Sequence, residues 1–231
     1  MSNDIKVETL DLKNFKYLTR ISMISISILT AAMAFTYHII KLGNFLAPGG
    51  VIAFSITYVL AAIVAEVYGY KNARNFVFSN FICIAVFNLT TTFLLHLPVP
   101  QGENYHSAYN VVFGHSFLIM FVYCSGFFVG DLVNTFAISK LKFLTNGRYF
   151  IARIIGSSSI GHIVFSIIAI PLLYAKTSDV SAVLYQFFTT VLIKVCIISI
   201  LAFPSKIIVS FLKRNENVKQ YEQEVFYNPF K

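Results

Sequence analysis

The sequence predicts an all-α polytopic membrane protein, a bundle of six transmembrane helices, and three observations lead to this prediction. The 231-residue chain is 57% hydrophobic and only 12% charged, whereas an ordinary soluble domain carries about 25% charged residues. Its mean hydropathy is +0.71. Uncharged runs long enough to span a bilayer, which takes about 20 apolar residues, recur along the chain. The low charge excludes a typical cytosolic enzyme, and the hydrophobicity excludes a disordered chain.

The first half of the chain contains three of the predicted helices. An uncharged run from Ile21 predicts a helix over about 20–40; it is longer than the apolar region of a signal peptide and no clear cleavage site follows it. The sequence Pro48-Gly49-Gly50 separates this helix from a second one over about 50–67. A third helix, over about 75–97, ends at the Pro and Gly residues of 98–102.

The second half contains the other three helices, over about 110–138, 150–174 and 181–211. Asn146-Gly147 predicts a turn before the fifth helix, and Lys194 is the one charge inside the last apolar run. The connections are too short for a soluble domain. We therefore expect a cytoplasmic N-terminal segment (1–19), a six-helix transmembrane domain (20–211) and a cytoplasmic C-terminal tail (212–231).

The basic residues predict the orientation. Thirteen of the 18 Lys and Arg residues fall beside the termini or in the loops on the same side as the termini, whereas the opposite loops carry only Lys41 and Lys176. By the positive-inside rule, both termini are cytoplasmic. The same asymmetry accounts for most of the +8 net charge. We therefore expect the lipid bilayer as a partner and no direct contact with nucleic acid.

Ionisable residues at membrane depth are costly, so the few in this chain are candidates for a site. Glu66, near the cytoplasmic end of the second helix, either binds a substrate or orients a basic partner, or it caps the helix end in the headgroup region. Asp131 in the fourth helix needs a basic partner, and Arg153 lies at a suitable depth to supply a structural ion pair. Asp131 or Glu66 is alternatively a group that couples transport to protons.

Two further polar residues lie deep in the last two helices. Lys194 is too far from the cytoplasmic surface to reach it, so we expect it to line a site. His162 follows Gly and Ser residues that allow close approach of helices, although a lone histidine is more often a satisfied core residue. Gly126 and Gly130 form a GxxxG pair typical of helix packing.

The sequence contains no enzyme motif and no metal-binding spacing. The cysteines, Cys83, Cys124 and Cys196, all lie in apolar runs with no partner at metal or redox spacing. We therefore expect no cofactor, no metal and no enzymatic activity.

Three stretches resemble one known family. The first runs from Phe54-Ser55-Ile56-Thr57-Tyr58 to Glu66-Val67-Tyr68-Gly69 and ends at Ala73-Arg74. The second contains Asn134, then Lys140 and Thr145 to Arg148, and continues through Arg153 and Ser157 to Gly161. The third is Lys194 followed by Pro204. Together they resemble the queuosine precursor transporter family, also called the vitamin uptake transporter family, over about residues 20–214.

This resemblance implies a fold and a function. Members are similar to six-helix importers of the bacterial inner membrane that take up 7-deazaguanine bases such as 7-cyano-7-deazaguanine, for salvage into tRNA queuosine. The family resembles the substrate-binding subunits of energy-coupling-factor vitamin transporters, and the resemblance implies transport without the ATPase module.

The chain departs from the family pattern at four positions. Ser55 replaces the usual Pro, and three usual carboxylates fall at Ala62, His162 and Phe165. A purine-like base presents N–H donors that a carboxylate accepts, so losing these groups changes substrate, affinity or proton coupling.

The sequence therefore favours an importer of a planar polar heterocycle. We expect the substrate-binding residues to be Glu66, Asp131, Asn134, Arg153, His162 and Lys194, with Tyr58 and Asn88 as weaker candidates. The alternatives are a substrate-binding subunit that needs an energising partner, an importer of another small heterocycle or vitamin, a membrane enzyme acting on lipid, and a purely structural membrane protein. Homo-oligomerisation stays open.

Overall fold

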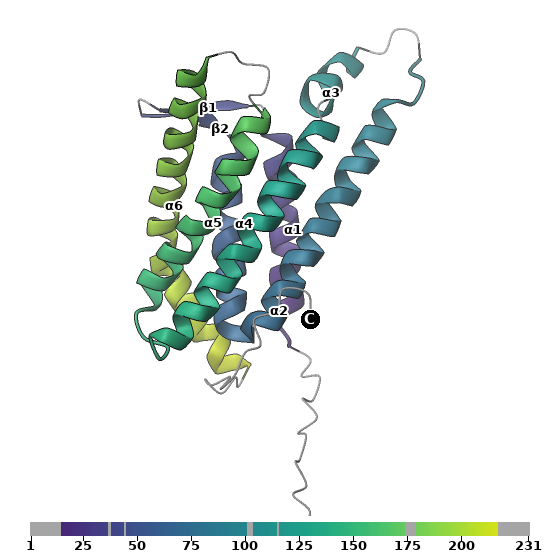
Figure 1. Ribbon diagram of the computed structural model, residues 1–231. Coiled ribbons are helices and arrows are strands. Elements are labelled where there is room, and N and C mark those ends of the chain that lie inside the picture. Colours follow the sequence, from purple (N-terminus) through teal and green to yellow (C-terminus); the bar gives the residue numbers. More distant parts are fainter. Residues whose placement is uncertain are drawn as a thin grey trace, which may run out of the picture.

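The computed structural model describes residues 15–36, 38–43, 45–100, 104–114, 116–173 and 179–216. Within these ranges there are six helices and one two-stranded hairpin. Most of the predicted N-terminal segment (1–19) and of the predicted tail (212–231) lies outside the described residues, so the structure does not test these boundaries. The all-α class predicted from the sequence is confirmed (Figure 1).

The first helix is shorter than predicted. Helix α1 spans Leu18–Ala34, and the chain then forms an antiparallel hairpin of β1 (Ile39–Leu42) and β2 (Phe45–Pro48), in which Ile39 pairs with Pro48. The predicted extension of the helix to residue 40 was wrong. Hydropathy does not separate a β-branched strand from the end of an apolar helix, because both are short apolar runs. The positive φ of Gly43, 62°, permits the tight reversal between the strands.

Helix α2 (Gly50–Leu95) covers both the second and the third predicted helix. It contains one non-helical residue, Gly69, with φ 83° and ψ 170°, and its two halves run in opposite directions on either side of this residue (Figure 1). Only glycine adopts this backbone region readily. The loop predicted between residues 67 and 75 is therefore reduced to a sharp break, and Lys71 and Arg74 lie in the helix that follows it.

The remaining helices are α3 (His106–Phe113), α4 (Ser116–Leu144), α5 (Phe150–Leu173) and α6 (Val180–Asn215). The fourth predicted helix, over 110–138, was wrong in its limits, because α3 ends at Phe113 and α4 continues to Leu144. Asp179 caps α6: its carboxylate accepts hydrogen bonds from the Ser181 amide at 2.9 Å and the Ser181 hydroxyl at 2.6 Å.

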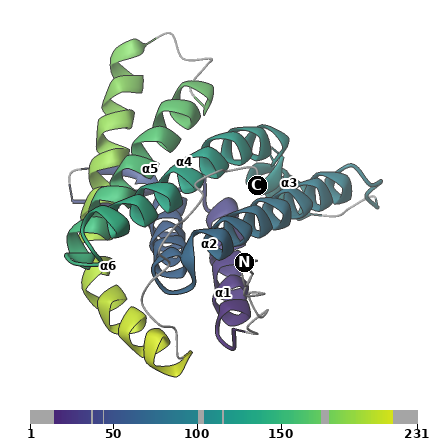
Figure 2. The same cartoon turned by 60° about the horizontal axis from the view of Figure 1, so that its bottom comes forward.

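The helices pack side by side as a bundle with two distinct ends (Figures 1 and 2). We call one end the basic end; it holds the reversal of α2, the turn at 145–149, the start of α1 and the end of α6. We call the other the hairpin end; it holds β1, β2 and the start of α6. The most extensive contacts are those of α4 with α5 and of α2 with α4, which places the first half of α2 in the interior.

The outer surface of the bundle is apolar. Large hydrophobic side chains point outwards along α6, for example Ile207 with 74% of its surface exposed and Phe203 with 65%. Within the described residues, three helices are long and apolar enough to cross a membrane: α2, α5 and α6. An apolar exterior that encloses buried polar and charged side chains, such as Glu66, Asp131 and Lys194, is the arrangement that lipid stabilises and water does not.

Candidate functional site

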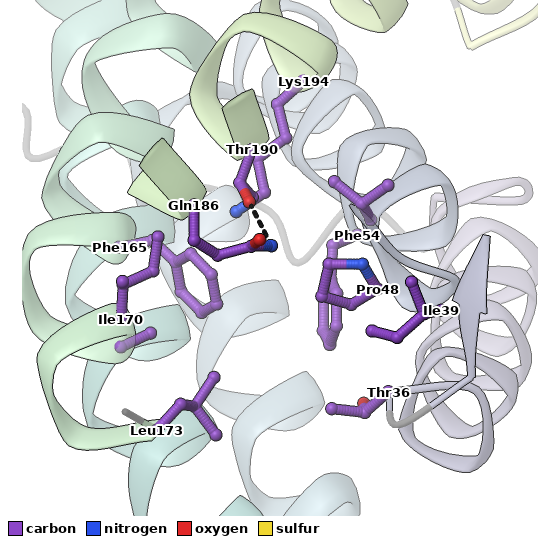
Figure 3. Close-up of a pocket in the computed structure, with 12 residues that line it drawn as sticks. Thr36, Ile39, Pro48, Phe54, Phe165, Ile170, Leu173, Gln186, Thr190 and Lys194 are labelled. Atoms are coloured by element: carbon purple, nitrogen blue, oxygen red, sulfur yellow. Dashed lines mark hydrogen bonds between the residues drawn. The ribbon is translucent and has the colours of Figure 1, made fainter. Parts of the chain in front are cut away.

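A cavity of about 240 Å³ lies between α2, α5 and α6, beneath the β-hairpin. Figure 3 shows side chains from these elements pointing towards a common space. The lining is mainly apolar and is completed by a few polar groups: Thr36, Ile39, Pro48, Val51, Phe54, Phe165, Ala169, Ile170, Leu173, Gln186, Thr190 and Lys194. This composition is typical of small-molecule pockets, although the volume is below their usual range of about 300–1,000 Å³. The cavity therefore suits a small ligand.

One row of polar side chains reaches the cavity from α6. Gln186, Thr190 and Lys194 are spaced four residues apart, so they lie on one face of the helix. The Gln186 amide Nε2 donates a hydrogen bond of 3.2 Å to Thr190 Oγ1, as Figure 3 shows. This row supplies most of the hydrogen-bonding capacity of the cavity wall.

Lys194 is the charged member of this row. Its side chain is only 1% exposed, and its Nζ atom lies 4.0 Å from the centroid of the Phe165 ring. Within the described part of the chain, Nζ has no hydrogen-bond or ion-pair partner. The structure therefore places this predicted site residue on a ligand-sized cavity.

Four other predicted residues form a buried polar cluster between α2, α4 and α5. The Tyr58 and His162 rings are stacked, with centroids 3.9 Å apart. Asn134 Nδ2 donates to the Tyr58 carbonyl at 3.0 Å and to Asp131 Oδ1 at 3.3 Å, and Asn134 Oδ1 accepts from the Ser158 hydroxyl at 3.2 Å. All four candidates are fully buried. They do not line the cavity, so their contact with a ligand stays a prediction.

Close approach of α4 and α5 makes this cluster compact. A Cβ atom on Gly161 would lie 2.6 Å from the Gly130 carbonyl oxygen, and one on Gly130 would clash with the Tyr58 hydroxyl. The helix-packing role expected for Gly130 is thus supported by the geometry. Gly126 lies on the same interface, where its Cβ would meet Phe165 at 3.3 Å.

The predicted residues at the basic end form an ion network. Glu66 Oε2 accepts from Arg153 Nη1 at 2.8 Å, and Glu66 Oε1 accepts from Lys213 Nζ at 2.7 Å. Lys142 Nζ donates to the Glu66 carbonyl at 3.0 Å. The expected ion pair between Asp131 and Arg153 was wrong, because the Arg153 guanidinium is turned towards Glu66 and the α5 N-terminal turn, where Arg148 O accepts from Nε. Glu66 orients basic partners, which is one of the roles expected for it.

Asn88 lies apart from the other candidates. It is buried in the second half of α2, and its Nδ2 atom donates to the Ile84 carbonyl one turn earlier at 2.9 Å. The structure shows no contact between Asn88 and the cavity.

Gln186 and Thr190 were missed as candidates, although the sequence contained a signal. Both precede Lys194 at steps of four residues, and a polar stripe of this kind inside an apolar helix indicates one buried face. Phe54 and Phe165 both fall at positions of the family pattern, but composition did not single them out as lining residues, because the chain has 24 phenylalanines and most of them lie in apolar runs.

The described residues contain no group of three or more His, Cys, Asp and Glu side chains that could hold a metal ion. Cys83 is partly buried and Cys196 is exposed. His115 and the side chain of Cys124 lie outside the described residues.

A helical bundle with an apolar exterior and a ligand-sized cavity between its helices defines a membrane protein that handles a small molecule. The matching family agrees with this class. The chain belongs to the family described as "Putative vitamin uptake transporter", whose family model matches residues 48–209. All cavity residues except Thr36 and Ile39 fall inside this match. No curated protein and no solved structure matches the chain.

The structure shows where three residues that depart from the family pattern lie. Ala62 is fully buried in the core, and His162 is stacked on Tyr58. Phe165, where the resemblance places a carboxylate, lines the cavity directly beside Lys194. An uncharged ring therefore lies beside the lysine at this position.

Proposed function

We propose that this protein imports a small planar heterocycle across the bacterial inner membrane, with queuosine precursors of the 7-deazaguanine class, such as 7-cyano-7-deazaguanine, as the substrates for tRNA queuosine salvage. The single observation that supports this best is the cavity beside Lys194, inside the part of the chain that matches the transporter family. A flat ring packs against Phe54 and Phe165, and the α6 polar row fixes its orientation.

The proposed topology follows from the same arrangement. Six spans, at the predicted 20–211 domain, place both termini and the basic end in the cytoplasm. The cavity then lies in the outer half of the bundle, and the Glu66 network joins α2, α5 and α6 on the inner side. Import requires this network to open while the substrate stays bound, so that the site becomes accessible from the cytoplasm.

Binding and transport in this proposal involve no covalent chemistry, so the protein acts as a transporter and not as an enzyme. Selectivity arises because a wrong ring leaves buried polar groups unpaired. Asp131 is a better candidate for proton coupling than Glu66, since Glu66 is held by two cations while Asp131 Oδ2 has no partner among the described residues.

Uptake of a radiolabelled 7-deazaguanine base tests the proposal. The host cells lack their own importer and their own synthesis of the base, and the protein is expressed from a plasmid. We expect accumulation above the empty vector, and loss of accumulation in Lys194→Met at an unchanged level of membrane expression. Accumulation equal to that of the empty vector would contradict the proposed substrate.

A substrate-binding subunit that needs an energising partner is the second candidate. Ala31, Ala32 and Ala34 on α1 provide small residues of the kind that dock helices, and Ala31 is exposed while Ala32 is buried. Reconstitution of the purified protein alone into liposomes separates the two, because autonomous uptake excludes a strict need for a partner.

A further inference from the structure

The charge balance of the cavity limits what it can bind. Lys194 is the one cationic residue in the described lining, and no Asp or Glu side chain belongs to that lining. The two salt bridges of the described residues lie at the basic end and involve Glu66, not Lys194. The cavity therefore presents the Lys194 amino group without a carboxylate counter-ion among the described residues.

Burial makes this charge costly in the empty protein. The side chain is 1% exposed, and a buried ammonium group without a partner loses its hydration without compensation. The Phe165 ring, 4.0 Å from Nζ, offsets part of this loss through its π face. Lys194 Nζ has no hydrogen-bond acceptor among the described residues. An acceptor on the ligand would therefore supply the missing hydrogen-bond partner.

The other polar groups of the cavity are uncharged, so they do not favour a cationic ligand. The Thr36 hydroxyl donates to the Ala32 carbonyl at 3.0 Å, and Thr190 Oγ1 accepts from Gln186. Neither residue carries a negative charge that would neutralise a cation on the ligand. A cationic ligand would therefore meet Lys194 in an apolar surrounding, where like charges repel strongly.

We infer that Lys194 selects planar ligands that carry a carboxylate or a carbonyl oxygen at the ring edge, and that it rejects ligands bearing a positive charge. This inference rests on the proposed function in that it takes the cavity as the substrate site, but it concerns the charge of the ligand and not the identity of the ring. Phe165 contributes because its uncharged ring lies beside Nζ, so it supplies no counter-ion to the lysine.

A charge series on one ring tests the inference. Binding of 7-carboxy-, 7-cyano- and 7-aminomethyl-7-deazaguanine to the purified full-length protein in detergent is measured by titration calorimetry; the substituents are anionic, neutral and cationic. We expect the carboxylate to bind at least about tenfold more tightly than the amine, the scale of a hydrogen bond to a buried charge. Equal affinities for the two, or tighter binding of the amine, would overturn the inference.

The variant Lys194→Met assigns the preference to the residue. In this variant, we expect the carboxylate and the amine to bind with affinities that differ by no more than about threefold, because the hydrogen bond to the lysine is lost. Lys206→Met, which removes an exposed lysine of the same helix, is the control and should keep the wild-type ratio. Since Lys194→Met replaces an unpaired buried charge by an apolar side chain of similar length, we expect it to fold, as thermal unfolding would show. An unchanged ratio in Lys194→Met would overturn the inference.

A second ring separates failure of the inference from failure of the proposed substrate. Pyridine-3-carboxylate, pyridine-3-carboxamide and 3-(aminomethyl)pyridine are titrated in the same way. If no deazaguanine binds but the pyridine carboxylate binds more tightly than the pyridine amine, the queuosine precursor proposal fails and the charge selection stands. Absence of binding by all six compounds would overturn both.

Discussion

Arg153 Nη1 lies 2.8 Å from Glu66 Oε2, and both side chains are buried, at 2% and 3% exposure. This pair joins the start of α5 to the end of the first half of α2, directly before the Gly69 break. Lys213 adds the end of α6 to the same carboxylate. One glutamate thus connects three helices at the basic end.

Replacing this carboxylate should weaken the bundle strongly. Glu66→Gln leaves the buried Arg153 guanidinium without its counter-ion, and breaking one partner of a buried ion pair costs about 3–5 kcal/mol. The free energy of unfolding in mixed detergent micelles with SDS measures the effect. Lys213→Gln is the milder control, because Lys213 is 20% exposed and partly exposed pairs contribute about 1 kcal/mol or less. Equal losses in the two variants would contradict the central role of Arg153.

The contact of α4 with α5 should not tolerate a methyl group at Gly161. In Gly161→Ala the Cβ atom would lie 2.6 Å from the Gly130 carbonyl oxygen, so the helices must separate, which costs about 1–3 kcal/mol. Gly156→Ala is the matched control on the same helix, because its Cβ meets nothing within 4 Å. Unfolding by SDS should distinguish the two variants, and a Gly161→Ala protein as stable as Gly156→Ala would show that the helices are not in tight contact.

The reversal of α2 should depend on Gly69. Its φ of 83° and ψ of 170° are favourable for glycine alone, so Gly69→Ala should lower stability by about 1–3 kcal/mol. Far-UV circular dichroism during thermal unfolding provides the measurement. Gly156→Ala serves again as the control for a glycine in regular helix. An unchanged melting temperature would mean that the chain reverses without this backbone conformation.

Phe165 should contribute to ligand affinity through its ring. Phe165→Leu keeps an apolar side chain but removes the aromatic face, and aromatic contacts of this kind contribute about 0.5–1.5 kcal/mol. We therefore expect the dissociation constant for 7-cyano-7-deazaguanine to rise about two- to twelvefold, measured by calorimetry. Phe188→Leu, at an outward-facing position with 66% exposure, should leave affinity unchanged. The same loss in both variants would point to a general effect on folding.

The orientation is testable with single cysteines in a variant whose native Cys83, Cys124 and Cys196 are replaced by Ser. Asn146 lies in the turn before α5 at the basic end, and Val99 follows the C-terminal end of α2 at the other end of the bundle; each is replaced by Cys. In intact cells, a membrane-impermeant thiol reagent should label Val99→Cys and not Asn146→Cys, because the positive-inside rule places the basic end in the cytoplasm. The reverse pattern would invert the proposed topology.

Hydropathy predicted the class of fold but not every boundary. The uncharged runs identified α5 and α6 closely, since long apolar stretches bounded by charge and turn residues have few alternatives. The hairpin was missed because Ile39 and Ile40 continue the apolar run of α1, and the Gly69 break was read as a loop because the basic residues after it are typical of one. In both places the chain direction changes through backbone geometry, which hydropathy does not record.

For the candidate residues, too, the sequence predicted one property and not another: it predicted burial but not pairing. Rarity of charge in the membrane selected Lys194, Glu66 and Asp131 correctly as buried polar groups. Pairing followed from the relative rotation of the helices, so that Arg153 contacts Glu66 and not Asp131. Depth along a helix is encoded in the sequence, but the direction of a side chain towards another helix is not.

By itself, the sequence determined that this chain is an all-α membrane protein with a basic end and a few buried charges, because lipid solvation constrains composition residue by residue. Tertiary structure alone decided which buried groups share a space. It placed Lys194 of α6 beside Phe165 of α5 at a cavity. The cluster of Tyr58 and Asp131 does not line this cavity. The physical reason is that the direction of a side chain towards another helix depends on how the helices pack; at the contact of α4 with α5, for example, Gly130 and Gly161 permit the close approach.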